Sequence, residues 1–173
     1  MINRICTFYF TGTDTTKRVV QSIANEVAEK LNVKEIFDYN FTTPASREEM
    51  PEFKEGDLVI AGVPTIAGRV PNLLLPYLKK INGNGALGVA IGLYGNRNID
   101  DCLVELRDLM SNGGINVIAG GAFIGEHSFS QILAKNRPDN KDMEIVSEFS
   151  KKIAEKIERE DFSNPEMVGE VPY

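Results

Sequence analysis

Four threonines cluster near the start of the chain, in the hexapeptide Thr11-Gly12-Thr13-Asp14-Thr15-Thr16. Their hydroxyls can donate hydrogen bonds to an anion, and the apolar pattern that follows predicts a helix whose first backbone N–H groups face the same point. This combination suits a phosphate group and needs no basic side chain. A threonine-rich helix cap without a ligand explains the hexapeptide equally well. The spacing matches neither a Walker loop nor a dinucleotide fingerprint.

An alternation of strands and helices must position this loop. The apolar run at 5–10 predicts a strand before it, and apolar residues at helical spacing predict a helix from 15 to 31 after it. Thr15 or Thr16 can cap this helix, and Asn32 ends it. The same patterns predict further strands at 33–38, 57–62, 86–94 and 115–123, a helical turn at 46–50, and helices at 71–80, 99–110, 128–134 and 142–158.

Five such alternations predict an α/β fold, a doubly wound five-stranded parallel sheet with helices on both faces. The commonest strand order is 2-1-3-4-5, and ligands then bind beyond the carboxyl ends of the strands. Four loops that leave those ends are the candidates for a site: 11–16, 62–71, 94–100 and 123–139. We expect one domain over residues 1–160 and a C-terminal tail over 161–173.

The composition excludes several classes of protein. A chain of 173 residues is one domain's worth and buries roughly 70% of its unfolded surface. Its two cysteines, Cys6 and Cys102, are too few and too far apart for a disulfide framework or a metal cluster, so we expect both to be buried thiols in a reducing cytosol.

The net charge of −6 argues against nucleic acid as a partner. No signal peptide or apolar run long enough to span a membrane is present, so we expect a cytoplasmic protein without a membrane partner.

Several further motifs lie in the loops that face the expected site. They read Gly62-x-Pro64, Ala67-Gly68-Arg69-x-Pro71, Tyr94-Gly95-Asn96-Arg97, Ala122-Phe123-Ile124-Gly125-Glu126-His127-Ser128 and Arg137-Pro138-Asp139. Together with the segment from Phe8 to Lys17, they resemble the flavodoxin-like superfamily. The chain is most similar to the flavodoxin half of the ferredoxin–flavodoxin fusion proteins of anaerobes, over about residues 4–158.

This resemblance implies that the chain binds flavin mononucleotide (FMN). By position, the loop around the 5′-phosphate would comprise Thr11, Gly12, Thr13, Asp14, Thr15 and Thr16. One side of the isoalloxazine ring would lie against Pro64, Thr65, Ile66, Ala67 and Gly68, and the other side or edge against Tyr94, Gly95, Asn96 and Arg97. The stretch from Phe123 to His127 would close part of the pocket.

The chain departs from the family pattern at two positions. Asp14 stands where glycine is usual, and its carboxylate would repel a phosphate unless it points away or Lys17 or Arg18 compensates. Ile66 stands where an aromatic residue often stacks on the flavin, a loss of roughly 0.5–1.5 kcal/mol. The cysteine clusters of the fusion relatives are missing too, so the expected partner is a redox protein such as a separate ferredoxin.

Four side chains near the expected site each allow two interpretations. His127 could relay a proton or cap a short helix, and Asn96 could contact the flavin or complete a turn. Arg69 and Arg97 could bind an anion or the flavin edge, or they could be solvated loop arginines. Asp100 and Asp101 are typical first-turn helix acids.

The sequence favours an FMN-binding electron-transfer protein, in which no residue is catalytic. The first alternative is an NAD(P)H- or quinone-dependent FMN reductase that uses Arg69, Arg97 and His127. The second is a flavodoxin-like binding module that has lost the flavin. A hydrolase triad is excluded because the chain has one histidine and no Gly-x-Ser-x-Gly motif, and clustered metal ligands are lacking.

Overall fold

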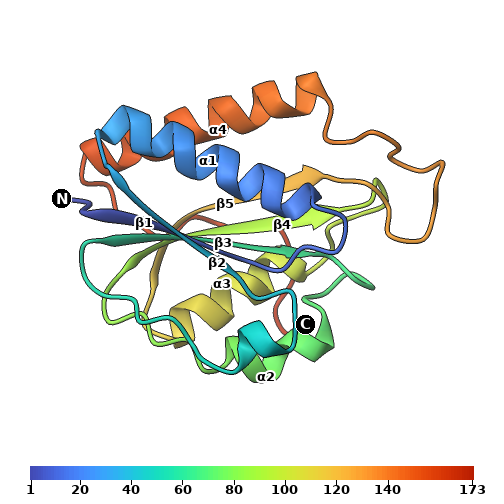
Figure 1. Cartoon of the computed structure of the whole chain (residues 1–173), viewed down its shortest axis with the longest axis horizontal. Helices are drawn as coiled ribbons and strands as arrows, with labels where there is room; N and C mark the ends of the chain where they lie inside the picture. Colours follow the sequence, from blue (N-terminus) through green and yellow to red (C-terminus); the bar gives the residue numbers. More distant parts are fainter.

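A computed structural model describes all 173 residues and contains one parallel sheet with the strand order β2-β1-β3-β4-β5 (Figure 1). The predicted fold and strand order are therefore confirmed. The strands are β1 (Arg4–Tyr9), β2 (Glu35–Asn40), β3 (Asp57–Pro64), β4 (Leu87–Tyr94) and β5 (Asn116–Ile124). Strand β2 begins two residues later than predicted, at Glu35, which pairs with Arg4, the first residue of β1. The 3₁₀ turn at Ala45–Arg47 is the only helical structure between β2 and β3.

Helices cover both faces of the sheet (Figure 1). Helices α1 (Thr15–Leu31) and α4 (Asn140–Glu158) pack side by side on one face. Helix α3 (Cys102–Asn112) and the single-turn helix α2 (Leu75–Leu78) lie on the other face. Two apolar cores result, one on each side of the sheet. None of these helices is long and apolar enough to cross a membrane.

One predicted helix is only partly confirmed, and another is wrong. The helix expected at 71–80 is a 3₁₀ turn (Asn72–Leu74) followed by the short α2. Pro76 explains the break, since it has no backbone N–H to donate to the preceding turn. The segment 128–134 forms turns and bends, because its apolar side chains are exposed and have no core to pack against. A helix of that length is unstable without packing.

The first turn of α1 differs from the predicted cap. Asp14, rather than Thr15 or Thr16, is the N-cap residue, and its side chain makes no capping hydrogen bond. Its backbone is left-handed, with φ of 61°, a conformation that aspartate tolerates better than most residues. The Thr11 hydroxyl accepts a hydrogen bond from the Lys17 N–H at 3.4 Å. The C-cap Asn32 ends the helix as predicted, with φ of 53°.

Both cysteines are buried in the core, as predicted. Burial raises the pKa of the Cys6 thiol to about 11 and that of the Cys102 thiol to about 12. Because the thiolate is the reactive species, we expect both to resist alkylation at pH 7.5 until urea unfolds the chain. A thiol assay with and without urea checks this, and rapid reaction of either cysteine in the folded protein would contradict it.

Candidate functional site

A cavity of about 280 Å³ opens beyond the carboxyl ends of β1, β3 and β4. Four loops form its wall, and each follows a strand of the sheet. The lining residues are Phe10, Gly12, Thr13, Thr15 and Thr16; Pro64 to Gly68; Leu93, Tyr94, Gly95, Arg97 and Asn98; and Gly125 to Phe129. This is the switch point of the sheet, where ligands bind in doubly wound folds. The cavity therefore brings together most of the residues that the sequence predicted.

Four predicted residues do not line the cavity. The Thr11 hydroxyl is engaged with the first turn of α1. Asn96 has φ of 63° and completes the turn, which is the second of its two interpretations. The Phe123 ring is part of the core between the sheet and helices α1 and α4, where it packs against Phe149 with the centroids 5.4 Å apart. Asp14 lines a neighbouring hollow together with Arg18.

The threonine loop offers hydrogen-bond donors that the protein itself does not use. The backbone N–H groups of Gly12, Thr13, Thr15 and Thr16 make no hydrogen bond within the chain. The hydroxyls of Thr13 and Thr15 lie 3.2 Å apart at the same wall of the cavity. Asp14 does not line the cavity; it lines a neighbouring hollow that it shares with Thr13, Thr15 and Arg18. The loop can therefore bind an anion at the N-terminus of α1.

A tight turn forms the second wall. The backbone groups of Ile66 and Arg69 exchange two hydrogen bonds, of 3.0 and 3.1 Å. Ala67 and Gly68 between them both have positive φ, at 51° and 79°. Glycine is required at position 68, since a Cβ there would lie 2.6 Å from a carboxylate oxygen of Asp100. The turn thus presents an aliphatic surface and backbone groups to the cavity.

Arg69 fits neither of its two interpretations. Its guanidinium donates two hydrogen bonds to the Glu105 carboxylate, from Nε at 2.8 Å and from Nη2 at 2.6 Å. The same carboxylate accepts the buried Val70 N–H at 2.9 Å. Arg69 does not line the cavity; with Glu105 it fixes the base of the turn to helix α3. Arg97 does line the cavity, and it makes no ion pair.

One polar atom in the cavity wall lacks a partner that matches its polarity. Thr65 Oγ1 is buried without a nitrogen or oxygen partner, and the weakly polar thiol of Cys102 lies beside it. Buried hydroxyls are normally hydrogen-bonded, and here the Cys102 thiol stands in the place of a nitrogen or oxygen partner. No cluster of side chains that could hold a metal ion is present.

His127 connects two walls of the cavity. Its Nδ1 accepts the backbone N–H groups of Phe129 and Ser130, each at 3.1 Å. It therefore holds a turn, and the short helix that it was predicted to cap is absent. Gly95 packs against it so closely that a Cβ at this position would lie 2.8 Å from the imidazole. The ring lines the cavity, and its Nε2 makes no hydrogen bond within the protein.

Sequence reasoning missed several lining residues, of which Phe129 is the most prominent. Its side chain is 90% exposed and lies at the mouth of the cavity. The other missed residues are Phe10, Leu93, Asn98 and Ser128, whereas Gly125 and Glu126 lie in the predicted stretch Phe123 to His127. An aromatic residue in the loop after the last strand was a usable signal for Phe129. This signal was not used because a helix was predicted for 128–134.

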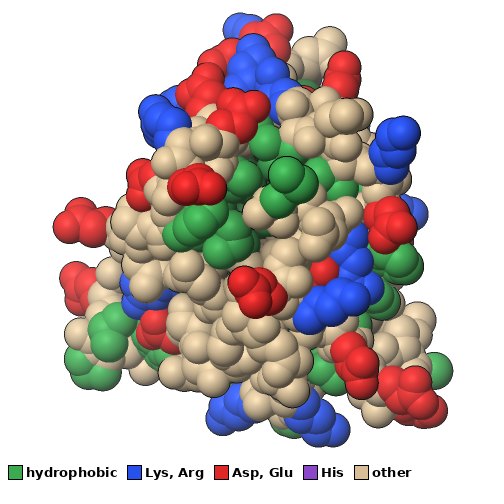
Figure 2. Space-filling model, turned by 90° about the vertical axis from the view of Figure 1, so that its left-hand side faces the viewer, with side chains coloured by type: hydrophobic (Ala, Val, Ile, Leu, Met, Phe, Trp, Pro, Cys, Tyr) green, Lys and Arg blue, Asp and Glu red, His purple; other side chains and the backbone are tan.

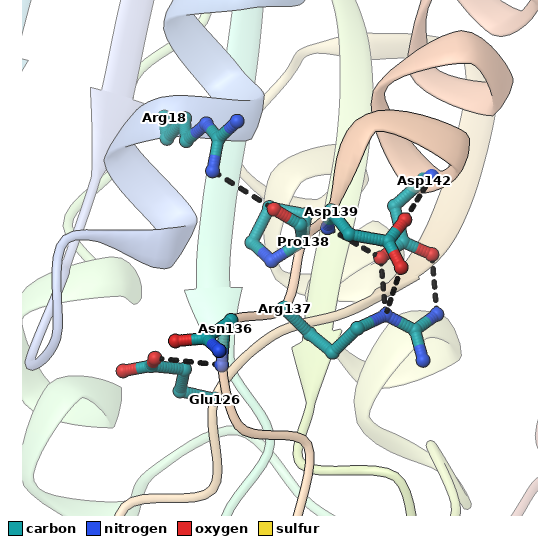
Figure 3. A network of polar contacts seen from close by, with 7 residues as sticks. All are labelled: Arg18, Glu126, Asn136, Arg137, Pro138, Asp139 and Asp142. Carbon is teal, nitrogen blue, oxygen red and sulfur yellow. Dashed lines mark hydrogen bonds and ion pairs between the residues drawn. The ribbon is translucent and has the colours of Figure 1, made fainter.

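A polar network closes the base of this last loop (Figure 3). Arg137 makes a bidentate ion pair with Asp142, in the first turn of α4. Arg18 of α1 donates to the Pro138 carbonyl at 2.8 Å, and Glu126 accepts the Asn136 N–H at 3.1 Å. The network therefore joins the loop to both helices beside the threonine loop.

The Asp142 carboxylate makes part of the stability depend on pH. Hydrogen bonds from Arg137, and then from the Asp139 N–H, hold the pKa of Asp142 below its ordinary 3.8. The resulting stabilisation is complete above about pH 4 and is lost as the pH falls through the lower folded-state pKa. We expect Asp142→Asn to lower the free energy of unfolding by about 1–2 kcal/mol at pH 7. Urea unfolding should show this difference narrowing from pH 7 to pH 3, and a constant difference would contradict the assignment.

A larger hollow, of about 740 Å³, lies at the opposite end of the sheet, and Figure 2 shows this face. Hydrophobic side chains gather near its middle, among acidic and basic ones (Figure 2). The lining residues include Ile2, Leu31, Leu87, Ile157 and Phe162. This hollow lies at the amino ends of the strands, where no helix begins, so it lacks the anion-binding groups of the first cavity.

Solved structures of flavodoxins share this architecture. A flavodoxin from the domain Archaea has a TM-score of 0.62 and 19% identity, over 90% of this chain and 99% of its own. The flavodoxin of Streptococcus pneumoniae TIGR4 has a TM-score of 0.61 and 17% identity, over 88% and 99%. An NADH:FMN oxidoreductase, in its apo form, has a TM-score of 0.58 and 11% identity, over 89% of each chain. No protein-family model and no curated protein matches the sequence.

The chain therefore has the flavodoxin-like fold. Its candidate site lies at the carboxyl ends of the strands and combines an anion cradle with a largely uncharged cavity. The closer resemblance to the flavodoxin half of fusion proteins stays a prediction.

Proposed function

We propose that this protein binds FMN in the cavity and carries electrons between partner proteins. The observation that carries the proposal is the set of unused backbone N–H groups in the threonine loop, beside the Thr13 and Thr15 hydroxyls, which hydrogen-bond only to each other. Such a cradle at a helix N-terminus suits a phosphate monoester. The solved flavodoxins that share the fold support the same assignment.

The residues of the cavity fit the parts of FMN. Gly12, Thr13, Thr15 and Thr16 would hold the 5′-phosphate. The turn that contains Ile66 would cover one side of the ring, with Tyr94 and Arg97 at the other side or edge. When bound, FMN supplies the electron-accepting ring, while the protein binds it, orients it and excludes part of the water.

The negative charge of the protein affects the reduction potential of a bound flavin. With a net charge of −6, the chain disfavours addition of further negative charge to a bound flavin, which lowers its reduction potential. A low-potential carrier needs a redox partner, for which we propose a separate ferredoxin or a comparable iron–sulfur protein.

Gel filtration with added FMN tests the proposal. The protein should leave the column with a flavin spectrum and about one FMN per chain. Dialysis under mildly denaturing conditions should remove the bound FMN. The resulting apoprotein should rebind FMN after refolding and recover the flavin spectrum. A colourless protein after incubation with excess FMN would overturn the proposal.

The second candidate function is an NAD(P)H- or quinone-dependent FMN reductase. The structural likeness to an NADH:FMN oxidoreductase favours it, as do Arg97 and the free Nε2 of His127 at the cavity. Steady-state turnover with NADPH, NADH and a quinone separates the two functions. Turnover that falls strongly in Arg97→Gln would support the reductase, whereas a carrier should show almost none.

A further inference from the structure

The C-terminal segment 161–173 packs along the sheet and leads toward the candidate site. After α4 it follows the free edge of β5, where the Asn116 side chain donates to the Phe162 carbonyl at 3.2 Å. Met167 then lies over Gly120 of β5, so closely that a Cβ on this glycine would be 2.2 Å from the sulfur. The chain thereby passes to the face covered by α3, and its last residue lies near α2 (Figure 1).

The end of the segment contacts helix α3 and Arg69, the last residue of the cavity turn. The Glu170 N–H donates to Asp101 Oδ1 at 2.8 Å, at the N-terminus of α3. Gly169 packs against Val104 of the same helix. The Tyr173 ring lies against the Arg69 guanidinium, whose carbon is 4.5 Å from the ring centroid. This distance is within the range of a cation–π interaction.

These two contact points are also the two anchors of the cavity turn. The Asp101 N–H donates to the Gly68 carbonyl at 2.9 Å, so Asp101 connects the segment directly to the turn. Arg69 closes the turn through its hydrogen bonds with Ile66, and Glu105 and Tyr173 together hold its guanidinium. The segment therefore supports the turn at its C-terminal end, at Gly68 and Arg69.

The turn needs such support because its conformation is unfavourable. Alanine rarely adopts positive φ, yet Ala67 has φ of 51°. Backbone conformations of this kind persist where the surrounding structure holds them, and they occur often at ligand sites. Ile66 itself is 44% exposed, so contacts within the cavity do not fix the turn.

We propose that residues 161–173 form a strap that positions the Ile66–Arg69 turn, with Tyr173 as a positioning residue that acts through Arg69. The effect on the ligand rests on the proposed binding of FMN. The effect on the turn does not.

The first test measures the turn in the flavin-free protein. In Tyr173→Ala, NMR hydrogen exchange of the Ile66 and Arg69 amides should rise about 3- to 10-fold, the factor for loss of one cation–π contact. Tyr173→Phe keeps the ring and should exchange as the wild type does. Val168→Ala is the matched control, since this strap side chain is 59% exposed. Unchanged exchange in Tyr173→Ala and in a chain that lacks 161–173 would overturn the proposal.

The second test measures the dissociation constant for FMN with the same variants. It should rise about 3- to 10-fold in Tyr173→Ala and remain unchanged in Tyr173→Phe and Val168→Ala. If the wild type binds no FMN, the proposed function fails while the exchange data still decide the role of the strap. Faster exchange with an unchanged dissociation constant in the truncated chain would overturn the link to the ligand.

Discussion

Glu105→Ala is expected to lower the free energy of unfolding by about 2–3 kcal/mol. The Glu105 side chain is 4% exposed and accepts three hydrogen bonds, two from Arg69 and one from the Val70 N–H. Its removal leaves the buried Val70 N–H without a partner and the Arg69 charge without its counterion. The Arg69 side chain is 35% exposed and can reach water, which keeps the loss below that of a fully buried pair.

Urea unfolding at pH 7 measures this effect, and two variants control it. Glu105→Gln keeps one acceptor oxygen and should lose about half as much stability. Ser111→Ala, at an exposed position of the same helix, should change stability by less than about 0.5 kcal/mol. A Glu105→Ala protein as stable as the Ser111→Ala protein would show that the pair does not hold the turn to α3.

Thr15→Val is expected to weaken FMN binding about 10- to 100-fold. The Thr15 hydroxyl lines the cavity 3.2 Å from that of Thr13, and the proposed phosphate would accept hydrogen bonds from both. Valine keeps the shape of threonine and removes only the donor. A hydrogen bond to a charged group contributes about 1.5–3 kcal/mol, which gives the stated factor.

Fluorescence titrations with FMN and with riboflavin measure this effect. Riboflavin lacks the phosphate, so its dissociation constant should not change in Thr15→Val. Equal losses for the two ligands would contradict the assignment of Thr15 to the phosphate and would indicate a general disturbance of the loop.

Local patterns in the sequence were sufficient for most of the fold. Helix α1 spans the predicted residues because its apolar spacing and the helix-ending Asn32 are both local signals. The strand order followed from the alternation of elements and the handedness of crossovers. The helix predicted at 71–80 is shorter, and it begins as a 3₁₀ turn, because Pro76 has no backbone N–H to donate to the preceding turn.

The site was predictable only where its residues lie in contiguous motifs. The threonine loop and the segment Pro64–Gly68 line the cavity as expected. The role of Arg69 could not be predicted, because its partner Glu105 is distant in the sequence. Phe123 was predicted to close the pocket, but its ring packs against Phe149 in the core beneath α4. The C-terminal segment has no periodicity, so only the structure shows where it packs.

The departures from the family pattern have less effect in the structure than the sequence implied. Asp14 takes the left-handed conformation that a glycine would permit, and it lines a hollow that also contains the Arg18 side chain. The aromatic residue missing at Ile66 has a counterpart in Phe129, at the mouth of the same cavity. Neither change removes a group of the anion cradle.

Titration of the apoprotein with FMN and riboflavin in parallel, followed by flavin fluorescence, tests the central claim most directly. The account predicts a dissociation constant for FMN at or below about 1 μM and binding of riboflavin at least about 100-fold weaker, since the threonine loop would hold the phosphate. Equal affinity for the two flavins would contradict the role of this loop. No binding of either flavin would contradict the proposed function itself.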